Sequence, residues 1–66
     1  MEALYRNIRN LREDKDKTQV ELAKYLNITQ TTYSKYELGR ISIPIDVVIK
    51  LADYYDVSLD YLVGRK

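Results

Sequence analysis

Apolar side chains recur along the chain at the three- and four-residue spacing of helices. Leu4, Ile8 and Leu11 fall at i, i+4 and i+7, which places them on one face of a helix. No strand-like alternation stands out, and only two glycines and one proline interrupt the sequence. The pattern predicts an all-α fold, a compact five-helix bundle that forms one domain over residues 1–66. The predicted helices lie near residues 2–13, 19–26, 30–38, 45–55 and 59–63.

Polar and small residues mark where these helices begin and end. Thr18 and Glu21 predict a capping box, in which each side chain accepts a hydrogen bond from the backbone amide of the other residue. Thr29 is placed to cap the third helix. Asn27 and Gly39 follow helix ends, where a left-handed backbone is favoured. Only about three residues, 27–29, therefore join the second helix to the third.

This short link predicts a helix-turn-helix unit, because two helices joined so tightly must cross at a steep angle. The crossing needs a small residue where the backbones approach, and Ala23 supplies it. Apolar residues must also fill the wedge between the two helices. The candidates are Leu22, Leu26, Ile28, Tyr33 and Tyr36.

The segment 18–39, TQVELAKYLNITQTTYSKYELG, resembles the Cro/repressor-type (XRE-like) helix-turn-helix family of phage and bacterial transcription regulators. Matching stretches extend the resemblance over nearly the whole chain: residues 8–12, 39–44, 51–52 and 57–62. It implies a lambda-repressor-like domain that reads the major groove with its third helix and acts as a repressor. The sequence departs from the family at Asn27, where glycine is common, and at Leu38, where a polar residue is usual. Tyr33 and Tyr36 stand where aliphatic residues often pack.

The outer face of the third helix carries side chains suited to base edges. A helical wheel centred on Tyr33 places Glu37 and Arg40 on the inner face. Thr31, Ser34, Lys35 and Leu38 point outward, and Gln30 lies on the border at the start of the helix. The predicted base contacts are Gln30, Thr31, Ser34 and Lys35. Gln30 can pair with adenine N6 and N7, and Lys35 can donate to guanine O6 and N7. The alternative interpretation is an ordinary solvated surface.

Other polar residues near this helix are candidates for contacts to the DNA backbone. The predicted phosphate contacts are Thr18, Gln19, Thr29, Thr32, Arg40 and Ser42. Free backbone amides at the start of the second helix suit an anion. In the family, the residue at Gln19 grips the DNA backbone and often braces the one at Gln30. The resemblance also implies that Arg12 pairs with Glu37, which makes Glu37 a structural residue and not a catalytic acid.

Composition narrows the possible chemistry. The chain has no cysteine and no histidine, so it can form neither a zinc finger nor a histidine-based triad. Asp53, Asp56 and Asp60 fit no calcium-loop spacing. We expect no enzyme activity, no cofactor and no metal. No apolar run approaches the roughly 20 residues of a membrane helix, so we expect no membrane partner and a cytoplasmic, nucleoid-associated location.

The formal net charge is only +1, so charge alone does not indicate whether the chain binds nucleic acid.

One helix-turn-helix domain reads only a few base pairs. The expected partner is therefore palindromic, operator-like duplex DNA, bound by a homodimer that can assemble on the DNA itself. Leu59, Leu62 and Val63 are candidate dimer contacts. The alternative is a protein-interaction module, such as an antitoxin or partner-docking regulator, which the low charge and Leu38 favour.

Overall fold

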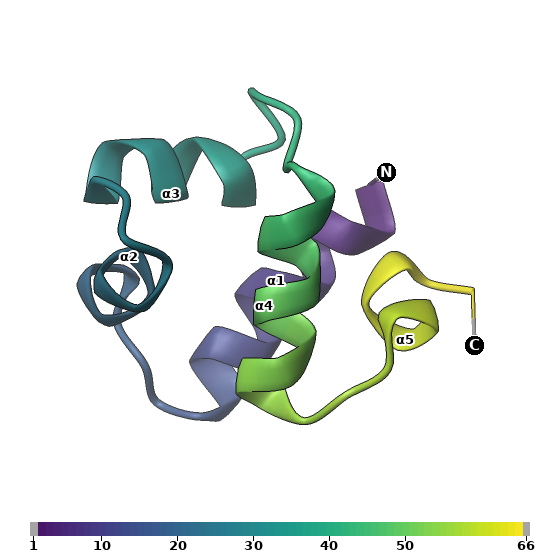
Figure 1. Cartoon of the computed structure of the whole chain (residues 1–66). Helices are drawn as coiled ribbons and strands as arrows, with labels where there is room; N and C mark the ends of the chain where they lie inside the picture. Colours follow the sequence, from purple (N-terminus) through teal and green to yellow (C-terminus); the bar gives the residue numbers. More distant parts are fainter. Residues whose placement is uncertain (1, 66) are drawn as a thin grey trace.

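The computed structural model describes residues 2–65 and folds them into five helices (Figure 1). They are α1 Glu2–Asp14, α2 Gln19–Leu26, α3 Gln30–Glu37, α4 Ile45–Tyr55 and α5 Leu59–Val63. Each helix begins and ends within one residue of its predicted range. The described residues contain no strand, so the prediction of an all-α, five-helix fold is confirmed. Within the same residues, no helix is long and apolar enough to cross a bilayer.

Local hydrogen bonds explain where α2 and α3 begin. The Thr18 hydroxyl accepts from the Glu21 amide at 3.1 Å, and the Glu21 carboxylate accepts from the Thr18 amide at 2.8 Å. The predicted capping box is therefore confirmed. Thr29 caps α3 by accepting from the Thr32 amide at 3.1 Å. Between the two helices Asn27 adopts φ of 60°, the left-handed backbone that the sequence predicted.

The third helix ends one residue earlier than predicted. α3 runs to Glu37, and Leu38 is its C-cap. Gly39 then turns the chain with φ of 71°. A side chain at this position would also lack space, because a Cβ atom would lie 2.9 Å from the Tyr5 ring. Glycine is thus required here both by the backbone conformation and by the neighbouring ring.

One apolar core joins the five helices. In Figure 1, α1 and α4 cross at the centre, the α2–α3 pair lies on one side and α5 on the other. Tyr33, Tyr36 and Tyr55 are buried, which confirms their predicted place in the core. The spacing of Val48, Leu51, Ala52 and Tyr55 predicts the buried stripe of α4, and Val47 is buried as well although it lies outside that stripe. Side chains with no exposed surface come from each helix: Leu4, Ile8, Leu22, Tyr33, Leu51 and Leu62.

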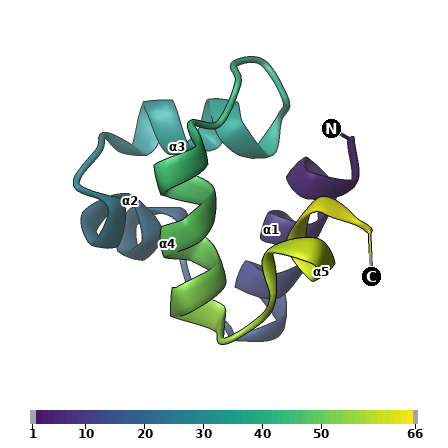
Figure 2. The ribbon, with the colours of Figure 1, turned by 45° about the vertical axis from the view of Figure 1, so that its right-hand side comes forward.

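The short helix α5 packs beside α1 (Figure 2). The Asn7 side-chain amide donates to the backbone carbonyls of Tyr61 at 3.1 Å and Leu62 at 3.0 Å. The Leu62 side chain is fully buried, whereas Leu59 is 41% exposed. Of the candidate dimer contacts, Leu62 therefore belongs to the core, and Leu59 remains on the surface.

Candidate nucleic-acid interface

The helix pair α2–α3 holds the outer face of α3 away from the core. The Ile28 amide donates to the Ala23 carbonyl at 3.0 Å, which closes the turn tightly. Ala23 is buried where the sequence required a small residue. On the inner side of α3, Tyr33 and Tyr36 are buried in the core. Since one face of α3 is anchored in this way, the opposite face is presented to solvent.

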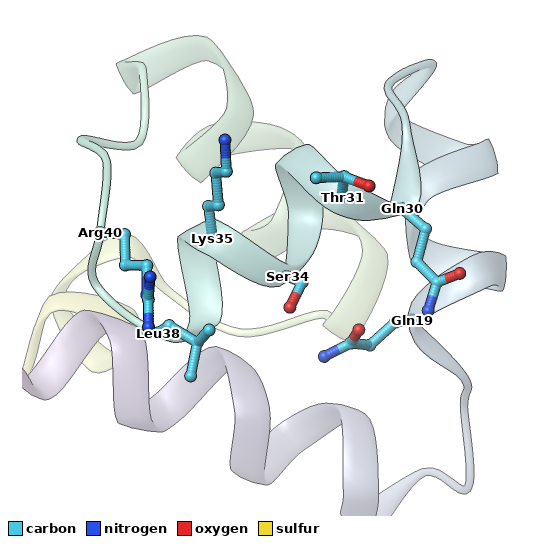
Figure 3. Close-up of a pocket in the computed structure, with 7 residues that line it drawn as sticks. All are labelled: Gln19, Gln30, Thr31, Ser34, Lys35, Leu38 and Arg40. Atoms are coloured by element: carbon cyan, nitrogen blue, oxygen red, sulfur yellow. The ribbon is translucent and has the colours of Figure 1, made fainter.

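That outer face forms one side of a surface hollow (Figure 3). All four predicted base contacts line it, together with two predicted phosphate contacts and Leu38. The lining residues are Gln19, Gln30, Thr31, Ser34, Lys35, Leu38 and Arg40. They come from the start of α2, the length of α3 and the segment after it. The structure thus brings together side chains from three stretches of the sequence.

The hollow is lined by side chains that form hydrogen bonds, and two of these side chains, Lys35 and Arg40, are positively charged. Gln30, Thr31, Lys35 and Arg40 are exposed, and Ser34 is half-buried. Figure 3 shows the Lys35 ammonium pointing away from the other side chains that line the hollow. Amide, hydroxyl and ammonium groups on one exposed helix are the groups that contact base edges in a major groove.

The remaining predicted phosphate contacts lie outside the hollow. Thr18 and Thr29 are both N-caps, and each hydroxyl oxygen is engaged by a backbone amide. The Thr29 hydroxyl donates to the Thr32 hydroxyl at 3.0 Å. Thr32 therefore keeps its own hydroxyl hydrogen for another acceptor. Ser42 is exposed in the loop before α4.

A buried ion pair connects α1 to the end of α3. Arg12 Nε donates to Glu37 Oε2 at 2.7 Å, and Arg12 Nη2 donates to Glu37 Oε1 at 3.1 Å. The Glu37 side chain is 3% exposed and that of Arg12 is 14% exposed. Burial opposes ionisation of Glu37, but hydrogen bonds led by the one from Arg12 outweigh it and hold its pKa below the ordinary value of 4.5. The carboxylate is therefore ionised at neutral pH.

Gln19 also contacts this ion pair, which the sequence did not predict. Its side-chain nitrogen Nε2 donates to Glu37 Oε1 at 3.2 Å. Within residues 2–65 no hydrogen bond joins Gln19 to Gln30, so the brace implied by the family resemblance is absent from this structure. The physical reason is that an ionised carboxylate is a stronger acceptor than a neutral amide. Gln19 and Glu37 lie 18 residues apart, and no local pattern marks the contact.

The helical wheel was wrong for Arg40. It placed this residue on the inner face of α3, but α3 ends at Glu37 and Arg40 is exposed. Its backbone follows the turn at Gly39, so the 100° step per residue no longer applies. Leu38 is 63% exposed at the edge of the hollow. A large apolar side chain thus lies among polar ones.

Two tyrosine hydroxyls are buried without a hydrogen-bond partner among the described residues, which the sequence did not predict. Tyr33 and Tyr55 each bury the hydroxyl oxygen with no hydrogen-bond partner among the described residues. Burial raises the pKa of both hydroxyls, so both stay protonated at neutral pH. Their rings were predicted as core, but the unpaired oxygens are visible only in three dimensions.

The structure gives no candidate metal centre in the part of the chain it describes, since no three carboxylate side chains gather there. Asp56 instead adopts a left-handed backbone after α4, with φ of 56°. Asp60 lies in the first turn of α5. An acidic residue at that position complements the positive end of the helix dipole.

A family model described as "Helix-turn-helix" matches residues 8–62 of the chain. The curated relatives include the cryptic phage CTXphi transcriptional repressor RstR of Vibrio cholerae serotype O1, 38% identical over 85% of this chain and 50% of the relative. The HTH-type transcriptional regulator ImmR of Bacillus subtilis is 35% identical over 96% of this chain and 50% of the relative. No solved structure gives a significant match.

A third relative, antitoxin PezA of Streptococcus pneumoniae serotype 4, is 32% identical over 91% of this chain and 38% of the relative. The chain spans about half the length of the first curated relatives that it matches. The matched part contains both helices of the α2–α3 pair and the hollow beside them.

Proposed function

The chain belongs to the Cro/repressor-type helix-turn-helix family, and from this premise we propose that it binds duplex DNA sequence-specifically and regulates transcription, as a repressor. The observation that carries the proposal is the hollow along α3, where the predicted base contacts lie on one exposed face. This family is one of DNA-binding regulators and not of enzymes.

The outer face of α3 reads base edges in the major groove. An α-helix with its side chains is about 10–12 Å in diameter, which fits a groove about 12 Å wide. Gln30 at the start of the helix pairs with adenine, and Lys35 donates to guanine. Thr31 offers a methyl group to thymine and Ser34 a hydroxyl to a neighbouring base edge.

The residues around α3 hold the DNA backbone and set the position of the helix. Arg40 supplies a cation where the chain leaves α3, and Ser42 lies close by in sequence. On the other side, the capped starts of α2 and α3 present backbone amides to phosphates. The side chains that take part there are those of Thr18, Gln19, Thr29 and Thr32.

We further propose that two copies bind a palindromic site as a homodimer assembled on the DNA, because one α3 covers only a few base pairs. The half-sites then lie about 34 Å apart, one helical turn of the duplex. Leu59, exposed on α5, is the candidate contact between copies. A protein that works in this way is located on the nucleoid.

A partner-docking role is the second candidate. Leu38 is an exposed leucine at the edge of the hollow, and one relative is named an antitoxin. In this role the hollow takes a segment of a partner protein, and DNA binding is secondary. A gel shift with random genomic fragments, run beside a pull-down from lysate, separates the two candidates.

Selection from a random duplex pool tests the proposed function. At about 50 mM salt, the chain is expected to enrich a short motif, repeated with two-fold symmetry. Gln30→Ala is expected to enrich a motif that is degenerate at one base pair of each half-site. The proposal fails if the chain enriches no motif, or if Gln30→Ala enriches the same motif as the unchanged chain.

A further inference from the structure

Leu38 is the one lining residue of the hollow whose side chain has no polar atom. It is 63% exposed, so water contacts most of it in the free chain. A polar DNA group placed over this side chain would lose its water without gaining a hydrogen bond, which costs free energy. An apolar DNA group in the same place would gain free energy by leaving water together with the leucine.

The backbone around Leu38 has no free donor for a phosphate either. The amides of Leu38, Gly39 and Arg40 all donate to backbone carbonyls of α3, at distances of 3.0, 3.1 and 2.9 Å. These bonds hold the end of the helix and leave no amide pointing at the DNA. A contact from residue 38 to the duplex therefore has to be an apolar contact of its side chain.

Leu38 continues the stripe of α3 that carries two of the predicted base contacts. Thr31, Ser34 and Leu38 fall at i, i+3 and i+7, so they lie on one face of the helix. Leu38 is the C-cap, but its backbone keeps right-handed helical angles, with φ of −83° and ψ of −6°. Figure 3 shows the Ser34 and Leu38 side chains on the same side of α3. Leu38 is therefore presented to the same partner as the base contacts before it.

Thymine presents the apolar group that suits this side chain. Among the groups on the base edges of the major groove, the C5 methyl of thymine is the apolar one, and the others donate or accept hydrogen bonds. The carbon atoms of the deoxyribose offer a second apolar surface, but they occur at every base pair and carry no sequence information. Because Leu38 lies on the stripe of the base contacts, the thymine methyl is the partner that this placement favours.

We propose that Leu38 is a specificity-determining residue that packs against the C5 methyl group of a thymine and so selects thymine at one position of each half-site. The proposal rests on the DNA binding proposed above. Leu38 follows Gln30 by eight residues, which is about 12 Å along a helix at 1.5 Å per residue. Since successive base pairs are about 3.4 Å apart, the thymine lies no more than about four base pairs from the pair read by Gln30.

Replacing thymine with deoxyuridine tests the proposal, because deoxyuridine lacks the C5 methyl and keeps every hydrogen-bonding group of the base. Each thymine of the duplex selected from the random pool is replaced in turn, and Kd is measured by fluorescence anisotropy. At the thymine covered by Leu38, the replacement is expected to weaken binding of the unchanged chain by about 4-fold. In Leu38→Ala the same replacement is expected to change Kd by about 1.5-fold or less. A thymine contacted by Thr31 keeps its deoxyuridine effect in Leu38→Ala.

Leu38→Met and Ile45→Ala form the matched controls. Leu38→Met keeps an apolar side chain of similar size, so it is expected to retain the deoxyuridine effect. Ile45→Ala removes an apolar side chain of similar exposure, 68%, which belongs to α4 and does not line the hollow, so the effect is expected to stay complete. Because Leu38 is mostly exposed, Leu38→Ala is expected to fold like the unchanged chain, which circular dichroism checks.

The outcomes separate this inference from the proposed function. If the unchanged chain enriches no duplex, DNA binding itself fails. If it binds and Gln30→Ala relaxes one position, but no deoxyuridine effect depends on Leu38, thymine selection by Leu38 is wrong and DNA binding stands. Weaker binding of Leu38→Ala to all duplexes alike, with every deoxyuridine effect unchanged, would assign Leu38 to the deoxyribose and also overturn the proposal. An equal loss of the effect in Ile45→Ala would overturn it as well.

Discussion

Replacing Arg12 with alanine is expected to lower the stability of the domain by several kcal/mol, about 3–5 from the broken ion pair. The change leaves the Glu37 carboxylate, 3% exposed, without its cation. Breaking a buried pair from one side costs about 3–5 kcal/mol. Arg12 also donates to the Lys17 carbonyl at 3.0 Å, and this bond is lost too. A domain of 66 residues has a total stability of about 3–10 kcal/mol, so Arg12→Ala is expected to lose a large share of it.

Glu37→Ala is the informative comparison, because the two partners are buried to different extents. Arg12 is 14% exposed and lies 4.0 Å from the exposed carboxylate of Glu13, so it keeps some solvent and one counter-charge when Glu37 is removed. The decrease in the free energy of unfolding is therefore expected to be smaller in Glu37→Ala than in Arg12→Ala. Urea unfolding at pH 7, followed by circular dichroism, measures the free energy of unfolding of both variants. Equal losses, or a loss below about 1 kcal/mol in Arg12→Ala, would refute the reasoning.

The pH dependence supplies a second readout of the same prediction. In the unchanged chain the Glu37 pKa lies below 4.5, so its stabilising contribution is present above that pH and is lost as the pH falls through the lowered pKa. Without Arg12, burial dominates and raises the Glu37 pKa above its ordinary value. The difference in the free energy of unfolding between the unchanged chain and Arg12→Ala should then become smaller as the pH falls from 7 towards 4.5. A penalty that grows on acidification would contradict this account.

Three further predictions follow from the hollow and the turn beside it. Gln30→Ala and Lys35→Ala should each weaken binding to the selected duplex by about 1–3 kcal/mol and relax one base position, which competition with single-base variants would reveal. Arg40→Ala should weaken all duplexes alike and reduce the slope of log K against log salt by about 1; an unchanged slope would remove Arg40 from the phosphate contacts. Gly39→Ala should lower stability by about 1–2 kcal/mol, because alanine is strained at φ of 71° and crowds the Tyr5 ring. Thermal unfolding tests this last change, and a melting temperature equal to that of the unchanged chain would count against it.

Features set by neighbouring residues could be predicted from the sequence. The helix starts at Thr18 and Thr29 depend on contacts within three residues, and these caps were predicted correctly. The left-handed turn at Asn27 is equally local. Burial of Tyr33 and Tyr36 followed from their spacing on one helix face. The all-α fold and the exposed face of α3 are consequences of these local rules.

Features set by contacts between distant segments could not be predicted in this way. The bond from Gln19 to Glu37 depends on how α2 and α3 cross, and the bonds from Asn7 to α5 join residues more than 50 positions apart. Arg40 was misplaced because the wheel assumed a helix that in fact ends at Glu37. The candidate site could therefore be predicted as a set of exposed residues, but not as a network joined to the core.

Amide chemical shifts in a DNA titration test the central claim most directly. The ¹⁵N-labelled chain is titrated with the duplex selected from the random pool, and the shift of each backbone amide is followed. The account predicts that the largest changes fall on residues 30–35 and on the capped start of α2, and that they weaken as salt is added. Changes confined to α4 and α5, with residues 30–35 unmoved, would contradict the claim that α3 reads DNA.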